Sequence, residues 1–341
     1  MKKSLTALAA AICLLFAAGC HEIEEYPNTY MGNFDQLWQL FDEHYCFFEE
    51  KGVDWDSIYA QYRPRALNCR STQELFGVCS DMLSELRDGH VNLSSWFNTF
   101  YYRAWWSDYP QNFNERVLQE NYLYFNYDQL GPITFAILPS NIGYIRISSF
   151  DSGIGEGNMN AILAKLIRTR GLIIDIRYNG GGSMTNIETI ARRFMHGRTL
   201  AYSIRHKDGK GHNDFSEPYD VYFEPQADFL LWLNKPVALL TNRSTFSAAN
   251  VFAAVLKECP QVTVIGARTG GGGGMPLSYE LPFGWGVRMS AAPIHDARGN
   301  CIENGVDPTP GYEVNFTDED SAAGRDPILD TAVNFIETNG F

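Results

Sequence analysis

Residue types that could carry out acyl transfer occur at three separate places in the chain. The reaction needs a nucleophile, a base that takes its proton, a group that orients the base, and donors aimed at the developing oxyanion. Ser247 offers a hydroxyl, His90 offers an imidazole, and the adjacent Gly180 and Gly181 offer backbone N–H groups. No local spacing links these places, so the residue types alone give only weak support to this chemistry.

The residues around Ser247 predict a strand that leads into a helix. Val237 to Thr241 is an apolar run with the length of a buried strand. A stripe of helical period follows at Ala248, Val251, Phe252, Val255 and Leu256. Residues 242–245 favour a turn, which places Ser247 in the first helical turn, where free N–H groups and the helix dipole would stabilise an oxyanion. Serine is also a common helix cap, and that structural role stays open.

His90 and the two glycines also lie next to predicted element ends. Residues 71–74 have the capping-box spacing ahead of an apolar stripe, and Gly89 is expected to stop that helix directly before His90. A histidine at such a place is commonly a solvated partner of the helix dipole, which is the alternative here. Residues 171–177 predict an apolar strand, and the turn at residues 179–182 leads it into a helix near Ser183 or Thr185.

The rest of the chain divides by sequence pattern. Residues 33–95 predict a small helical N-terminal domain, with a second helix starting at Asp54 or Asp56. Residues 96–135 are aromatic and irregular and predict a connection of short strands and loops. Later segments predict alternating strands and helices at βαβ spacing, and we therefore expect an α/β fold. These segments are strands at 142–147 and 262–265, a helix at 159–167, a hairpin formed by 277–281 and 286–291, and a C-terminal helix.

Five consecutive glycines, Gly270 to Gly274, follow the strand at 262–265. They lack the Lys-Ser/Thr ending and the following helix of a phosphate-binding loop. They predict a loop that is mobile or closely approached by other backbone.

The N-terminus has the pattern of an export signal. Two lysines precede a short apolar run, which ends in small residues and Cys20. This resembles a bacterial lipoprotein signal, in which residues 1–19 are removed and Cys20 is acylated, although Ala17 stands where leucine is usual. Residues 20–32 would form a tether. The pattern predicts an outer-membrane lipoprotein of the cell envelope, facing the periplasm or the exterior; an ordinary secretory signal is the alternative.

Charge and cysteine content limit the partners. The formal net charge of −13 argues against nucleic acid and anionic membrane surfaces, so membrane contact is expected only through the lipid. The cysteines after Cys20 lack metal-ligand spacing and predict buried free thiols, with one disulfide left open. The sequence indicates no cofactor and no metal site, and it does not determine the oligomeric state.

Four motifs resemble, in their residues and their order, those of the C-terminal processing and tricorn-core family of serine peptidases. They are residues 87–91, 175–182, 244–250 and 303–308. The similarity extends over about residues 31–335. It implies a crotonase-like (ClpP-like) core of repeated β-β-α units in residues 136–341, behind the helical domain. The sequence between Val91 and Ile142 is too short for a PDZ domain, and none is expected.

The resemblance also implies which catalytic set the chain uses. One branch of the family uses a Ser–Lys dyad, and the place of its lysine falls on Gly272, which argues against that mechanism. The tricorn-like branch uses a histidine as base and a glutamate as its support, which correspond to His90 and Glu303. A further catalytic serine precedes the histidine in the tricorn core. Gly89 stands at that place here, and Asp88 is expected to cap the turn.

The mechanism implied is attack by Ser247 on a peptide carbonyl, with His90 as base and Glu303 as its support. The oxyanion would be bound by the N–H groups of Ala248 and of Gly180 or Gly181. The leading hypothesis is thus an exported, lipid-anchored serine endopeptidase that acts on proteins or peptides.

Other interpretations use the same residues. Retinoid-binding proteins of the eye share the family's architecture, so an inactive relative that binds apolar ligands or peptides is the main alternative. An esterase or lipase would need a Gly-x-Ser-x-Gly motif, which residues 245–249 lack. Glu303 could instead only close a turn, and Arg177 is expected to form a structural ion pair.

Overall fold

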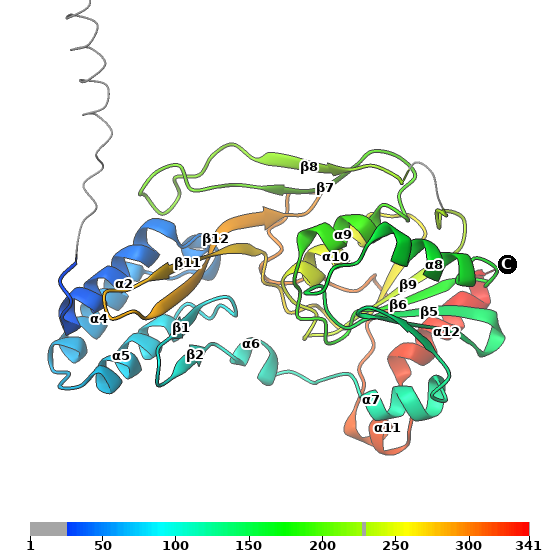
Figure 1. Cartoon of the computed structure of the whole chain (residues 1–341), viewed down its shortest axis with the longest axis horizontal. Helices are drawn as coiled ribbons and strands as arrows, with labels where there is room; N and C mark the ends of the chain where they lie inside the picture. Colours follow the sequence, from blue (N-terminus) through cyan, green and yellow to red (C-terminus); the bar gives the residue numbers. More distant parts are fainter. Residues whose placement is uncertain (1–25, 227–229, 341) are drawn as a thin grey trace, which may run out of the picture.

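The computed structural model describes residues 26–226 and 230–340. The molecule is elongated, with a helical part at one end, an α/β part at the other, and long strands between them (Figure 1). The predicted signal peptide, Cys20 and the first part of the predicted tether lie outside the described residues. None of the helices within the described ranges is long and apolar enough to cross a bilayer.

The helical part contains four helices, and a capping side chain marks the start of each except the second. They are α2 (Tyr30–His44), α3 (Phe48–Lys51), α4 (Trp55–Leu67) and α5 (Thr72–Ser84). Asp54 caps α4, and Ser71 caps α5 by accepting from the Glu74 N–H. The sequence predicted both starts. Two boundaries differ from the expectation, because α2 begins inside the predicted tether and α5 ends at Ser84, before Gly89.

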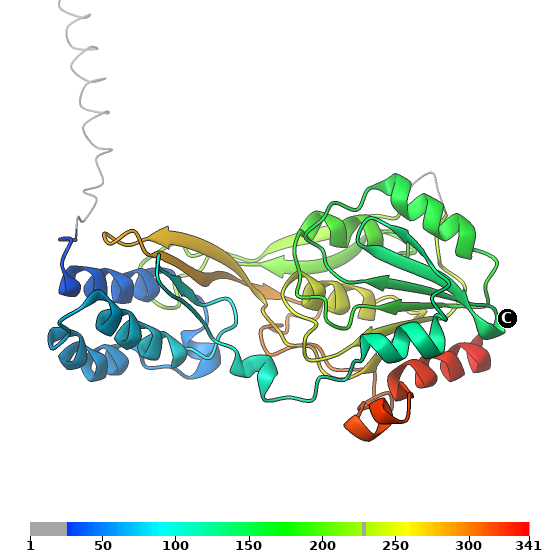
Figure 2. The same ribbon diagram turned by 60° about the horizontal axis from the view of Figure 1, so that its bottom comes forward.

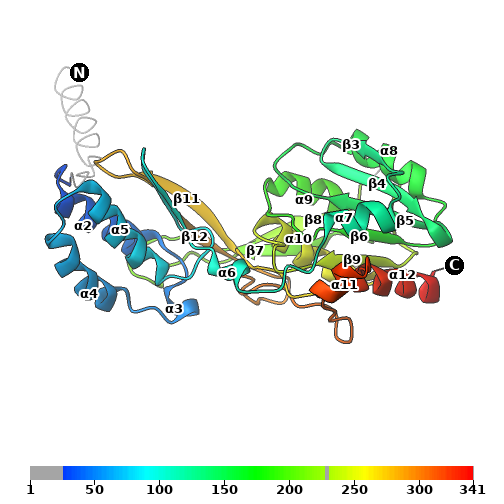
Figure 3. The same ribbon diagram turned by 90° about the horizontal axis from the view of Figure 1, so that it is seen from below.

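Strands from distant parts of the sequence complete the helical part. The strands β1 (Asn92–Ser94), β2 (Thr99–Tyr101), β11 (Gly274–Glu280) and β12 (Gly286–His295) form one antiparallel sheet, in which β1 pairs with β12. Figure 3 shows the β11–β12 hairpin beside α2 and α5. Leu281, Trp285, Val287 and Met289 are buried in the same core as Phe34 and Leu75. The sequence predicted the hairpin but assigned it to the catalytic domain, because hydrophobic periodicity does not reveal long-range pairing.

The sheet around β12 continues toward the α/β part. There, β12 pairs with β7 (Thr199–Ile204), and β7 pairs with β8 (Tyr219–Phe223). Neither β7 nor β8 was predicted. Figure 1 shows β7 and β8 running between the two parts.

The α/β part is built on a second six-stranded sheet with the order β10-β9-β6-β5-β4-β3. Its strands are β3 (Asp128–Leu130), β4 (Ile133–Leu138), β5 (Ile142–Ile147), β6 (Leu172–Asp175), β9 (Val237–Thr241) and β10 (Val262–Gly266). The four strands β5, β6, β9 and β10 are parallel, as βαβ spacing predicts. This arrangement confirms the expected α/β fold.

Helices cover both faces of the second sheet (Figure 2). Ile145, Ile174 and Leu239 contribute to the core shared with α8 (Glu156–Leu166), α9 (Met184–Ala191) and α10 (Ala248–Lys257). The alternate residues Tyr144, Ile173 and Leu240 contribute to the core shared with α12 (Pro327–Asn339). Successive side chains of a strand point to opposite faces, and both faces are buried here, which explains the nearly continuous apolar runs.

The connection between the two parts is more helical than expected. It includes α6 (Ala104–Ser107), α7 (Glu115–Val117) and a π-helical turn at Leu118–Tyr122. A further short helix, α11 (Asp318–Ala322), precedes α12. These helices are too short for a periodic apolar pattern to identify them, which is why the sequence indicated only strands and loops.

Arg177 forms the structural ion pair that the sequence predicted. It follows β6, is fully buried, and bonds both Asp175 and Asp326, the N-cap of α12. The pair therefore connects the carboxyl end of β6 to the start of the last helix. The five described cysteines are free thiols, so the disulfide left open by the sequence does not form among them.

Candidate active site

Ser247 lies between β9 and α10 in a strained backbone conformation. It is the N-cap of α10, with φ 57° and ψ −125°, and its side chain makes no capping hydrogen bond. A positive φ costs a non-glycine residue free energy and is kept only where the surroundings enforce it. The Ser247 N–H donates to the Gly271 carbonyl at 2.9 Å, and the Phe246 N–H donates to the Asn179 carbonyl at 3.0 Å. The turn therefore holds a hydroxyl that capping does not use.

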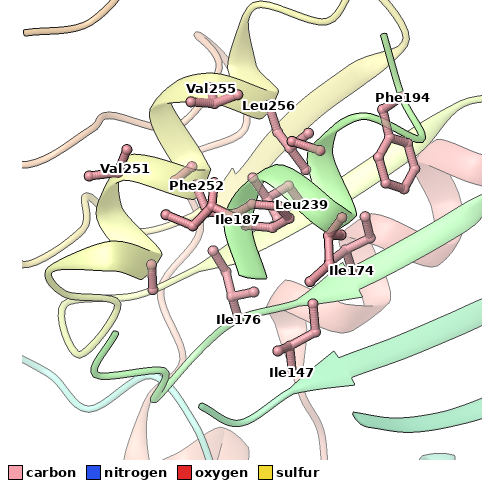
Figure 4. Close-up of a cluster of buried hydrophobic side chains, with 14 of the residues drawn as sticks. Ile147, Ile174, Ile176, Ile187, Phe194, Leu239, Val251, Phe252, Val255 and Leu256 are labelled. Atoms are coloured by element: carbon pink, nitrogen blue, oxygen red, sulfur yellow. The ribbon is translucent and has the colours of Figure 1, made fainter. Parts of the chain in front are cut away.

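Packing of α10 fixes the position of this turn. Figure 4 shows Val251, Phe252, Val255 and Leu256 of α10 clustered with side chains from β6, β9 and α9. Val251, Val255 and Leu256 are at most 1% exposed. Each fully buried side chain of this size stabilises the fold by about 1.5–3 kcal/mol, so α10 is firmly anchored. The predicted strand, turn and helix are all present, with Ser247 one residue before the first helical turn.

His90 reaches Ser247 from the helical part. Its Nε2 lies 3.0 Å from the Ser247 Oγ, within hydrogen-bond distance. The Asp88 Oδ1 accepts the His90 backbone N–H at 2.7 Å, and the Asp88 Oδ2 accepts the Tyr45 hydroxyl at 3.0 Å. Asp88 thus caps the turn, as expected, and Tyr45 fixes Asp88. The structure brings the predicted nucleophile and base together.

His90 is 4% exposed, which excludes the solvated role considered for it. It packs on Phe246 at a centroid distance of 4.8 Å, and Phe246 stacks on Trp105 at 4.1 Å. Burial lowers the pKa of His90 to about 4, although the charge of Asp88 acts in the opposite direction. The imidazole is therefore neutral near pH 7, as a base that must accept a proton requires.

Glu303 is buried near this pair but bonds other groups. Its Oε1 lies 2.8 Å from the Lys51 Nζ, and its Oε2 accepts the Gly273 N–H at 2.8 Å. Burial raises the pKa of Glu303 to about 7, with a smaller contribution from the charge of Asp88. Among the described residues, the His90 Nδ1 is buried without a hydrogen-bond partner. The expected direct support of the imidazole by Glu303 is therefore not formed, because the carboxylate is held by Lys51 and Gly273.

The place of the further tricorn serine has no room for a side chain. A Cβ at Gly89 would lie 2.6 Å from the Trp105 Nε1 and 2.9 Å from the Phe246 ring. Trp105, from α6, thus lies where that serine side chain would begin. The glycine is required by close packing, and no fourth catalytic side chain can come from this position while Trp105 remains there.

The candidate oxyanion donors lie on both sides of Ser247. A Cβ at Gly181 would lie 2.8 Å from the Ser247 Cβ and 2.9 Å from the Ala248 nitrogen, so the two turns are in contact. The Gly181 N–H already donates to the Asn179 Oδ1 at 2.9 Å. The Gly180 and Ala248 N–H groups donate to no other described residue. The structure thus favours Gly180 and Ala248 over Gly181 as donors.

The glycine run at residues 270–274 is buried and closely approached. A Cβ at Gly271 would lie 1.8 Å from the Glu303 carbonyl oxygen, and one at Gly272 would lie 2.6 Å from the Phe246 ring. The close approach was one of the two expectations for this loop. Because the glycines have no side chains, the loop can pass between Ser247 and Glu303. The close approach of Phe246 leaves no space for a lysine side chain at position 272.

Models of two known protein families match parts of the chain. The model of peptidase family S41 matches residues 141–310, and that of the tricorn protease C1 domain matches residues 26–84. The crystal structure of a candidate peptidase from Parabacteroides merdae has 43% sequence identity and a TM-score of 0.86, covering 90% of this chain and 96% of that chain. The chain belongs to peptidase family S41.

Other relatives of this S41 family member match it over shorter stretches. The carboxy-terminal processing protease CtpA of Bacillus subtilis is 29% identical over 171 residues, 50% of this chain and 34% of that protein. A candidate tricorn-like protease C-terminal subunit of Sulfurisphaera tokodaii is 32% identical over 196 residues, 56% of this chain and 20% of that protein. The matched region thus spans only 34% and 20% of these two relatives. The resemblance inferred from the four motifs is confirmed at the level of the family.

Several residues of the candidate site were not predicted from the sequence. Tyr45 and Lys51 come from the helical part, Trp105 comes from α6, and Asn179 binds the Gly181 N–H. The position of Asn179 directly before the glycines was the one local signal, since asparagine commonly bonds backbone two residues on. The other three residues lack any motif that ties them to Ser247.

Proposed function

We propose that this S41 family member is a serine endopeptidase that hydrolyses protein or peptide substrates through an acyl-enzyme at Ser247. The single observation that carries the proposal is the 3.0 Å approach of the His90 Nε2 to the Ser247 Oγ. The membership of the family and the strained backbone of Ser247 support it. A carrier of apolar ligands would not need a neutral imidazole next to a serine hydroxyl that makes no capping hydrogen bond.

The proposed reaction begins with proton transfer. The Ser247 Oγ attacks the carbonyl carbon of the scissile bond while its proton passes to the His90 Nε2. The N–H groups of Ala248 and Gly180 bind the oxyanion of the tetrahedral intermediate. The intermediate then collapses, and His90 donates the proton to the leaving amine. A water molecule, deprotonated by His90, hydrolyses the acyl-enzyme and restores Ser247.

The imidazolium that forms in this reaction needs negative charge nearby. We assign this role first to the buried carboxylate of Asp88, whose charge acts on His90, and then to Glu303, which lies in the same cluster. The charge of Asp88 already raises the pKa of His90, and it acts through the turn that the Asp88 side chain caps. Glu303 shares the buried cluster with Asp88, since the charge of Asp88 also raises the pKa of Glu303. In this proposal the expected Ser-His-Glu set acts through the charges of Asp88 and Glu303, because the ring donates no hydrogen bond to Glu303.

Replacement of Ser247 tests the proposal. Ser247→Ala should abolish hydrolysis of an unfolded protein and covalent labelling by a fluorophosphonate probe, while the melting temperature stays within a few degrees. Ser244→Ala is the matched control, because Ser244 lies in the same turn and the proposed mechanism gives it no role. Undiminished hydrolysis by Ser247→Ala would refute the assignment. Absence of labelling in the wild type, together with tight binding of apolar ligands, would favour the carrier.

We also propose that the protein is exported and anchored in the outer membrane by a lipid on Cys20. The support is the sequence pattern around Cys20 alone. Metabolic labelling with a palmitate analogue should mark the wild type and not Cys20→Ser, and the variant should leave the membrane fraction. Labelling that persists in Cys20→Ser would contradict the anchor but not the peptidase.

A further inference from the structure

Lys51 places a fixed positive charge in the active-site cluster. It is the last residue of α3, and its side chain is 10% exposed. Its Nζ lies 2.8 Å from the Glu303 Oε1 and donates to the Arg87 carbonyl at 3.2 Å. The Arg87 guanidinium in turn donates to the Lys51 carbonyl at 2.7 Å. These contacts hold the ammonium on the carboxylate from the side of the helical part.

The cluster holds two carboxylates that repel each other. Asp88 and Glu303 are 1% and 6% exposed, and the negative charge of Asp88 opposes ionisation of Glu303. The charge of Lys51 favours it, both through space and through the direct bond. The other ionisable groups whose interaction with Glu303 is evident are Tyr45, Cys46, Cys301 and Arg243. Among the side chains that the structure describes, Lys51 is the cation that bonds Glu303.

We propose that Lys51 is a positioning residue of the peptidase site, which keeps the Glu303 carboxylate ionised and fixed in the cluster with Asp88. The inference rests on the proposed function. With Lys51 present and Glu303 ionised, the two carboxylates and the ammonium carry one net negative charge, which the imidazolium neutralises as the reaction proceeds. The charges of Lys51 and Arg288 by themselves lower the pKa of His90, so the benefit of Lys51 comes through Glu303. Without Lys51, a buried carboxyl beside a second carboxylate takes up a proton, because burial and like charge both favour the neutral form.

The alternative is that the Lys51–Glu303 ion pair has a purely structural role and only joins the two parts of the molecule. The pH dependence of activity distinguishes the two roles. A purely structural bridge would lower stability and reduce activity by one factor at every pH. A lysine that keeps Glu303 ionised determines where activity is lost on acidification. Removing it raises the pKa of Glu303 above about 7, so the acid limb of the kcat/KM profile moves to higher pH.

The experiment compares Lys51→Met, Lys51→Arg, Glu303→Gln and the double variant Lys51→Met with Glu303→Gln. Profiles of kcat/KM for a peptide substrate are measured between about pH 5 and pH 9. We expect Lys51→Met to shift the acid limb upward by about one pH unit or more and to lose about tenfold in activity at pH 7. Lys51→Arg should restore the wild-type limb. In the Glu303→Gln background, Lys51→Met should have no further effect on the limb.

Two results would overturn the proposal: a Lys51→Met profile with an unshifted acid limb, or equal effects of Lys51→Met with and without Glu303. Lys257→Met, on α10, is the control for loss of a lysine elsewhere. Failure of the proposed function looks different, because Ser247→Ala would then keep its activity. If Lys51→Met does not fold, Lys51→Arg and Lys51→Gln supply the same comparison.

Discussion

The imidazole of His90 lies 3.0 Å from the hydroxyl of Ser247, although 157 positions separate the two residues in the sequence. The imidazole comes from the turn after α5, and the hydroxyl comes from the turn before α10. The two turns belong to different parts of the molecule, so the fold has to bring both parts together before a proton can pass between them.

Removal of the base should nearly abolish turnover. In His90→Ala the Ser247 hydroxyl has no proton acceptor, so kcat should fall by about 10²–10⁴-fold with little change in KM. Labelling by a fluorophosphonate should be lost in parallel. His206→Ala is the control, because His206 is exposed and lies in the loop after β7. An active His90→Ala enzyme would show that another group deprotonates the serine.

Activity should depend on the ionisation of Glu303. The pKa of Glu303 is raised from 4.5 to about 7. In the proposed mechanism, the ionised form of Glu303 is the one that stabilises the imidazolium. Since the carboxyl loses its proton as the pH rises, kcat/KM should increase through about pH 7. Protonation of His90 affects the profile only near its own pKa of about 4. Glu303→Gln should lack the limb near pH 7 and have low activity throughout; a wild-type limb in this variant would exclude Glu303 as its origin.

A side chain at Gly181 should disturb the nucleophile. The residue has φ +105°, and a Cβ there would lie 2.8 Å from the Ser247 Cβ. Gly181→Ala therefore combines backbone strain with a clash, and it should cost about 1–3 kcal/mol of stability and reduce kcat at least tenfold. Chemical denaturation and steady-state kinetics measure the two effects. Gly197→Ala serves as a control, because Gly197 has open space around its Cβ position; equal kinetics for the two variants would contradict the close approach.

Loss of a core side chain in the hairpin should destabilise the helical part and the site together. Trp285 is 2% exposed and packs edge-on against Phe76 at a centroid distance of 5.3 Å. Trp285→Ala should lower the free energy of unfolding by about 3–5 kcal/mol. Trp96→Ala is the matched control, since Trp96 is 86% exposed and its loss should change stability by at most about 0.5 kcal/mol. Equal melting temperatures for the two variants would show that the hairpin is not part of the core.

Local patterns were sufficient for the elements that hold Ser247 and His90. The stripe of α10, the cap at Ser71 and the apolar strand β6 depend on neighbours within a few residues, so the sequence indicated them. The pairing of β1 with β12 and the burial of Trp285 among helices depend on contacts between distant segments, which periodicity does not contain. Because the sequence does not reveal those contacts, the hairpin was assigned to the catalytic domain.

The candidate site was also predicted only in part. The motifs identified Ser247, His90 and Glu303, and the structure places the first two in contact. The expected hydrogen bond between the imidazole and Glu303 is not formed, because the carboxylate forms an ion pair with Lys51. No sequence motif includes Lys51. The positive φ of Ser247 was also missed, since Phe246, Asn179 and Gly271 impose it through hydrogen bonds between separate loops.

The β11–β12 hairpin leaves the α/β part, enters the core of the helical part and returns before Glu303. The helical part is consequently not a detachable accessory of a self-sufficient enzyme. A fragment that begins after residue 95 would lack the proton acceptor and would expose the apolar side of the hairpin to water. Neither the fragment up to residue 95 nor the remaining fragment should hydrolyse a substrate on its own. A mixture of the two should regain activity only to the extent that the β11–β12 hairpin packs against the helices.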